Sequence, residues 1–83
     1  RIGWEHNGEW YPWGTANIDK TFNPVRAAAF VAAFRRVADM AHRTPGIRVL
    51  TVWSPNFERL EPPEVAATYP GDEYVDVIAP DMY

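Results

Sequence analysis

Five residues able to move protons or bind a polar ligand follow three predicted strands of this sequence. They are Glu5, Ser54, Asn56, Asp81 and Tyr83. The C-terminal ends of parallel strands lie at one edge of a sheet, where active sites form in open α/β sheets and in barrels. We therefore expect two carboxylates, an amide, a hydroxyl and a phenol to converge at that edge.

Tryptophan is concentrated beside the first of these carboxylates. Trp4, Trp10 and Trp13 all fall within the first thirteen positions, and the fourth Trp is Trp53. Aromatic rings stack on sugar faces, and carboxylates bind hydroxyl groups or transfer protons. This combination favours a carbohydrate ligand.

Each of these residues also has a purely structural interpretation. Trp10 and Trp13 could pack under a loop, and Trp53 could fill a core or form a wall of the site. Asn56 could cap the turn after Pro55. A chain without any site would bury both Trp10 and Trp13.

The elements that must position these residues alternate between strand and helix. Residues 1–4 are predicted as the end of a strand, and residues 5–20 as a long loop of the kind that carries function. Asn23-Pro24 predicts a helix start, and Thr44-Pro45-Gly46 predicts its end. Apolar residues recur between them at steps of three and four, which indicates one packed face: Ala27, Phe30, Val31, Phe34, Val37, Ala38 and Ala41.

The second half of the chain continues the alternation. Residues 47–53 are predicted as a strand, residues 61–67 as a short helix, and residues 74–79 as a last strand. This order predicts an α/β fold with parallel strands and crossover helices. One long helix cannot cover both faces of three parallel strands, so we interpret the chain as a slice of a larger fold.

The composition is typical of a folded domain and excludes several classes of protein. The chain has 83 residues, 47% hydrophobic and 23% charged, with a net charge of -3 and no cysteine. Bulk charge therefore predicts no nucleic-acid partner, and no segment has the ~18 apolar residues of a membrane span. His6 and His42 have no second ligand at metal-binding spacing, so we expect no metal and no cofactor.

Several segments, in order, resemble glycoside hydrolase family 26, the β-mannanase family. Residues 1–14 (RIGWEHNGEWYPWG) resemble its fourth-strand region, and residues 52–56 (VWSPN) resemble the end of its fifth strand. Residues 69–76 (YPGDEYVD) and 81–83 (DMY) resemble the approach to its sixth strand and the end of that strand. The resemblance covers nearly the whole chain and identifies residues 1–83 as a fragment of a glycoside hydrolase catalytic domain.

The resemblance implies a partial (β/α)8 TIM barrel and a retaining glycosidase. Glu5 would match the general acid/base, and Tyr83 would match the tyrosine that hydrogen-bonds the nucleophile. The nucleophilic Glu of the family closes a seventh strand beyond this chain, so the remainder of the barrel is required and the isolated chain is expected to be inactive. The residues expected to bind substrate are Trp4, Asn7, Trp10, Trp13, Trp53, Asn56 and Asp81.

Two positions depart from the family pattern. The family often has His immediately before the acid/base, where this chain has Trp4, and that His would lie near the acid matched by Asp81. The next residue after the acid/base is frequently Met or Phe in relatives and is His6 here.

The family implies polysaccharide degradation, with β-1,4-mannan as the expected substrate and a secreted or cell-surface location. Mixed-linkage glucan, β-1,3-xylan and a bacterial exopolysaccharide remain alternatives. A non-catalytic carbohydrate-binding remnant, using Trp10 and Trp13 as a platform, is an alternative from another class. A pure binder would tolerate Glu5→Gln, whereas a hydrolase would not.

Overall fold

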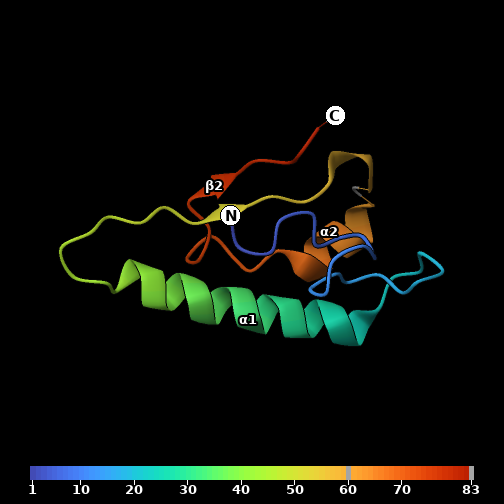
Figure 1. Cartoon of the computed structure of the whole chain (residues 1–83), viewed down its shortest axis with the longest axis horizontal. Helices are drawn as coiled ribbons and strands as arrows, with labels where there is room; N and C mark the ends of the chain where they lie inside the picture. Colours follow the sequence, from blue (N-terminus) through green and yellow to red (C-terminus); the bar gives the residue numbers. More distant parts are fainter. Residues whose placement is uncertain (60, 83) are drawn as a thin grey trace.

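The computed structural model describes residues 1–59 and 61–82, which form an α/β arrangement with a small parallel sheet. The elements are α1 (Pro24–His42), β1 (Val52–Trp53), the 3-10 helix η1 (Phe57–Arg59), α2 (Pro62–Thr68) and β2 (Val77–Ile78). Figure 1 shows α1 along one side of the molecule and the two strands on the other side. None of the helices in the described ranges has the length and apolar character needed to cross a membrane.

The expected parallel pairing is confirmed for β1 and β2. Val52 lies opposite Val77, and Trp53 lies opposite Ile78. Backbone hydrogen bonds extend the pairing past both strands, because Asp81 N–H donates to the Pro55 carbonyl at 2.8 Å and Phe57 N–H donates to the Asp81 carbonyl at 2.9 Å. The segments that follow the two strands therefore lie side by side.

The predicted strands are longer than the observed ones, and the first is absent. Residues 47–51 and 74–76 form no strand ladder within the described part of the chain, so the prediction of strands over 47–53 and 74–79 was too long. Residues 2–4 form turns, and no strand end is present in residues 1–4. The reason is visible in the backbone: Gly3 and Glu5 have φ values of 57° and 52°, in the left-handed region, which interrupts an extended conformation.

Helix α1 begins and ends where the sequence predicts. The Asn23 side chain accepts hydrogen bonds from Val25 N–H at 3.0 Å and Arg26 N–H at 3.1 Å, and Pro24 occupies the first turn. Gly46, with φ of 80°, follows the end of the helix. The buried face of α1 is narrower than the predicted apolar stripe and consists of Ala27, Phe30, Phe34 and Ala38.

The core lies between this face of α1 and the strand pair. Phe30, Phe34, Ala38 and Trp53 form its buried centre. Partly buried side chains from the N-terminal segment, α1, α2 and the segment between α2 and β2 pack around it. At the far end of α1, Asp76 Oδ2 accepts from Thr51 N–H at 2.8 Å and lies 2.7 Å from His42 Nε2. The hydrogen bonds from Thr51 and His42 lower the pKa of Asp76, so its charge helps to fasten the helix end to the strands.

Candidate active site

Glu5 lies at the expected edge, in a conformation that carries strain. Its N–H donates to the Ser54 carbonyl at 2.7 Å, so the residue is attached to the chain just after β1. The residue is 5% exposed, and its backbone φ of 52° is unfavourable for a residue with a Cβ. Strain of this kind costs about 1–3 kcal/mol and is concentrated at functional sites. The observation therefore supports a functional role for Glu5.

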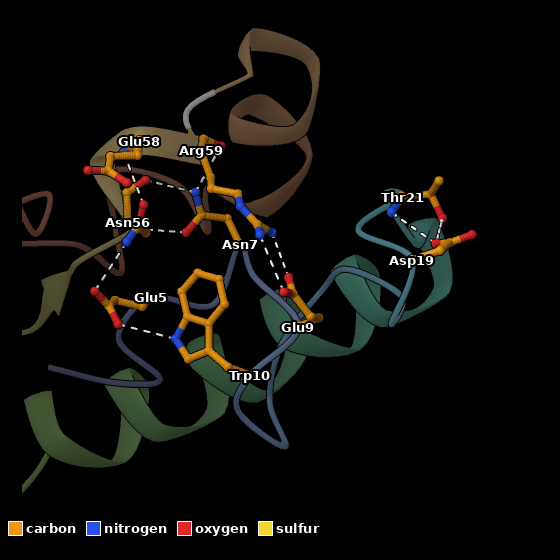
Figure 2. Close-up of polar contacts among 9 residues, drawn as sticks. All are labelled: Glu5, Asn7, Glu9, Trp10, Asp19, Thr21, Asn56, Glu58 and Arg59. Carbon is orange, nitrogen blue, oxygen red and sulfur yellow. Dashed lines mark hydrogen bonds and ion pairs between the residues drawn. The ribbon is translucent and has the colours of Figure 1, made fainter.

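Both carboxylate oxygens of Glu5 accept hydrogen bonds from neighbouring side chains (Figure 2). Trp10 Nε1–H donates to Oε2 at 3.2 Å, and Asn56 Nδ2–H donates to Oε1 at 3.3 Å. One donor comes from the loop that contains Glu5 and the other from the loop after β1. Together they fix the rotation of the carboxyl group.

Asn7 connects the same two loops through hydrogen bonds between its side chain and backbone atoms. Its Nδ2 donates to the carbonyl oxygens of Asn56 and Arg59, each at 3.0 Å, and its Oδ1 accepts from Asn56 N–H at 2.7 Å. Asn56 Oδ1 in turn accepts from Glu58 N–H at 3.0 Å, which is the turn cap expected from the sequence. Asn56 therefore both caps the turn and donates a hydrogen bond to Glu5.

Asp81 is half-buried and forms an ion pair with Arg1. The same guanidinium donates to Ser54 Oγ at 3.3 Å, and its central carbon lies 5.9 Å from the Trp4 ring centroid. Arg1 is thus the basic partner of Asp81, in the region where the family pattern would have placed a His at position 4. The sequence analysis did not single out Arg1.

The tryptophans divide between the loop and the core. Trp13 Nε1–H donates to the Trp4 carbonyl at 2.9 Å, and the Trp13 ring stacks on Tyr11 at 4.6 Å between centroids. Trp10 is 42% exposed and Trp13 is half-buried, so the two are not both buried as they would be in a chain without a site. Trp53 is buried in the core and donates Nε1–H to the Thr68 carbonyl at 3.1 Å. Of the two interpretations of Trp53, this position fits the filling of a core.

Two surface hollows formed by residues within 1–59 and 61–82 do not include Glu5. One of about 230 Å³ lies between Trp13, Phe30 and Arg26, and another of about 600 Å³ lies between Trp53, Tyr69 and neighbouring side chains of α2 and β2. Their lining is mostly aromatic and aliphatic. The carboxylate edge is therefore distinct from both hollows.

His6 is buried directly behind Glu5 as a neutral ring. It stacks on Phe30 at 4.1 Å between centroids, and its Nε2 lies 2.9 Å from Thr68 Oγ1. Thr68 Oγ1 also lies 3.2 Å from the Val65 carbonyl oxygen, to which it can donate. Burial lowers the pKa of His6 from 6.5 to about 4.

Acidification is expected to destabilise the fold through His6. The unfolded chain takes up a proton at pH 6.5, whereas the folded chain resists it down to about pH 4. Stability contributed by the neutral ring is therefore complete above pH 6.5 and falls by about 3 kcal/mol as the pH drops to 4. An NMR titration of the His6 ring protons and denaturant unfolding at several pH values measure the effect. A His6→Phe variant should lack this part of the pH dependence, and a His6 midpoint near 6.5 would contradict the prediction.

Tyr83, which the sequence analysis expects in the site, lies outside the described residues. Glu9 and Arg59, which the sequence analysis did not select, form an ion pair beside Trp10. No spacing signal connects residues 50 positions apart in two loops. Within residues 1–59 and 61–82, no group of three or more acidic or histidine side chains could hold a metal ion.

The arrangement can hold one carboxyl group for proton transfer. Glu5 is shielded from water, is oriented through both oxygens and lies beside an exposed indole. Two neighbouring carboxylates are held in ion pairs, Asp81 with Arg1 and Glu9 with Arg59.

Comparison with known proteins gives a consistent result along the whole chain. The family described as glycosyl hydrolase family 26 matches residues 1–83. The mannan endo-1,4-beta-mannosidase A and B of Caldalkalibacillus mannanilyticus is 35% identical over 80 residues, which are 95% of this chain and 15% of that protein. The endoglucanase H of Acetivibrio thermocellus is 30% identical over 80 residues, again 95% of this chain but 9% of that protein. The chain therefore spans a small part of both relatives. No solved structure is a significant match.

Proposed function

Since this chain belongs to glycosyl hydrolase family 26, we propose that it forms part of the catalytic barrel of a retaining endo-β-1,4-mannanase, with Glu5 as the general acid/base. A (β/α)8 barrel has ~250 residues, about three times the length of this chain. We place the chain around the fourth to sixth strands of such a barrel and the nucleophilic carboxylate elsewhere in a longer protein.

One observation carries the proposal: the buried and strained Glu5 is held through both oxygens at the C-terminal edge of parallel strands. Active sites of barrels form at this edge. The Asn56 and Trp10 donors set the direction of the carboxyl group, and Trp10 is itself 42% exposed.

The proposed reaction has two steps in which Glu5 changes role. First, Glu5 as an acid donates its proton to the glycosidic oxygen while the nucleophilic carboxylate attacks the anomeric carbon, and the carbon–oxygen bond breaks. Second, Glu5 as a carboxylate takes a proton from water, which attacks the anomeric carbon and displaces the nucleophile. A retaining enzyme places its two carboxyl groups about 5–5.5 Å apart.

Mannan is the favoured substrate, and a β-glucan is the second candidate. The relative named as a mannosidase shares 35% identity with this chain, and the relative named as an endoglucanase shares 30%. Residues beyond this chain would complete the sugar-binding subsites and set the choice.

A non-catalytic carbohydrate-binding role predicts a different use of Glu5. A binder would gain nothing from a strained backbone and a buried, doubly hydrogen-bonded carboxylate. In that alternative Trp10 and Trp13 would form the binding platform, and Glu5 would not be needed.

The test is hydrolysis by the intact enzyme of which these residues are a part. We expect cleavage of β-1,4-mannan with fresh products of β configuration, observed by NMR before mutarotation, and slower cleavage of mixed-linkage glucan. The exposed Glu73→Gln variant should behave as wild type. Products of α configuration, or no cleavage of any β-glycan, would contradict the proposal.

A further inference from the structure

Glu9 and Arg59 form a two-point ion pair across the two loops of the site. Arg59 Nη1 donates to Glu9 Oε2 at 2.6 Å, and Nη2 donates to Oε1 at 3.3 Å. Parallel contacts of this kind fix the plane of the guanidinium group as well as its position. The hydrogen bonds from Arg59 lower the pKa of Glu9, so Glu9 remains ionised in mildly acidic solution.

The pair is partly accessible to solvent. The side chains of Arg59 and Glu9 are 27% and 22% exposed. Ion pairs in contact with water typically contribute ~0–1 kcal/mol. What such a pair does provide is a fixed orientation for a flat, charged group.

The fixed guanidinium packs on Trp10. Its central carbon lies 5.1 Å from the centroid of the Trp10 ring, within the range of a cation–π contact. Gly8 permits this position of the indole, because a Cβ at residue 8 would lie 1.9 Å from the ring. Trp10 is therefore confined by Arg59 and by Gly8, and in that position its Nε1–H donates to Glu5 Oε2.

Arg59 also lies at the end of the short segment that supplies the second donor to Glu5. Asn56 precedes η1, and Arg59 N–H donates to the Asn56 carbonyl at 3.3 Å. One turn of chain thus controls both oxygens of Glu5, directly through Asn56 and indirectly through Arg59 and Trp10 (Figure 2). The contacts form a closed ring from Glu5 through Asn56, Arg59 and Trp10 back to Glu5.

We infer that Glu9 and Arg59 are positioning residues, which hold the Trp10 indole against Glu5 and so keep the proton-donating carboxyl group in its working orientation. The inference rests on the proposed role of Glu5. Neither Glu9 nor Arg59 need touch the substrate. Their loss should therefore affect the steps in which Glu5 donates or takes up a proton, and leave the glycosylation step with an activated leaving group nearly unchanged.

The experiment compares two substrates in the intact enzyme, one with a natural sugar leaving group and one with an activated aryl leaving group. Arg59→Lys keeps the charge but loses the planar two-point contact, and Glu9→Gln removes the other half of the pair. For both variants we expect kcat on the natural substrate to fall about tenfold with little change in KM, and the glycosylation rate on the aryl glycoside to change little. Glu61→Gln is the matched control, because Glu61 is exposed in the same loop and its side chain makes no cap hydrogen bond.

A second variant tests the position of the ring without touching the ion pair. Gly8→Ala should displace the Trp10 indole and give the same selective loss. In a Glu5→Gln background, Arg59→Lys should cause no further loss on the natural substrate, because residues acting through one group are not additive.

Three results would overturn the inference. They are wild-type rates for both Arg59→Lys and Glu9→Gln, an equal loss on both substrates, or an undiminished effect of Arg59→Lys in the Glu5→Gln background. Failure of the proposed function gives a different result, because Glu5→Gln would then show no dependence on the leaving group.

Discussion

Glu5→Gln in the intact enzyme is expected to lower kcat/KM on β-1,4-mannan oligosaccharides by about 10²–10⁴-fold, the usual contribution of a general acid. The amide keeps the size of the side chain but has no proton of suitable acidity for the glycosidic oxygen. An activated aryl mannoside needs no such proton, so its first step should proceed at nearly the wild-type rate. Stopped-flow release of the aryl group measures that step separately from turnover.

The control for this prediction is Glu73→Gln, an exposed Glu remote in sequence from the site. It should retain wild-type rates on both substrates. A Glu5→Gln enzyme that is folded and hydrolyses mannan at the wild-type rate would remove Glu5 from the mechanism. It would leave a carbohydrate-binding role for this surface.

The isolated 83-residue chain is expected to release no reducing sugar from any β-glycan. Retaining hydrolysis needs two carboxyl groups, and the carboxylates of Asp81 and Glu9 near Glu5 are paired with Arg1 and Arg59. Apolar side chains also remain exposed around the strands, where we propose that the rest of the barrel packs: Leu50, Val77, Ile78 and Met82. A reducing-sugar assay with the intact enzyme as positive control tests the prediction.

Turnover by the purified 83-residue chain with retained configuration would contradict that prediction. It would mean that a second carboxylate of this chain acts as the nucleophile. Asp81→Asn is the variant that would identify it, since Asp81 is the candidate at the same edge.

The sequence predicts the helices and the site edge well because local signals determine them. Asn23 and Pro24 specify the start of α1, and the three-four spacing of Phe30, Phe34 and Ala38 specifies its buried face. The meeting of Asn56 and Asp81 follows from parallel pairing alone. Whether Glu5, Trp10 and Asn56 act on a substrate stays a prediction.

The contacts that orient Glu5 cannot be predicted from local sequence signals. The φ of Glu5, the Arg1 pair with Asp81 and the Glu9 pair with Arg59 depend on how loops distant in sequence meet. The strands are shorter than predicted for a related reason. A β-branched run predicts an extended segment, but the length of a ladder depends on a paired neighbour.

His6 illustrates how packing decides the role of a titratable residue. A histidine beside a carboxylate suggests proton transfer, yet this ring is buried against Phe30 and bonded to Thr68. Although His6 follows Glu5 in the sequence, its ring lies in the core and not in the site.

Chemical rescue of Glu5→Ala by azide in the intact enzyme is the most direct test of the assignment of Glu5 as the acid/base of a retaining enzyme. Without its side chain, water cannot be activated and the covalent intermediate from an activated aryl mannoside should accumulate. Azide needs no base and should attack that intermediate. We predict faster turnover in proportion to azide concentration and a β-mannosyl azide product, identified by NMR. No rescue by azide, or an α-mannosyl azide, would contradict the assignment.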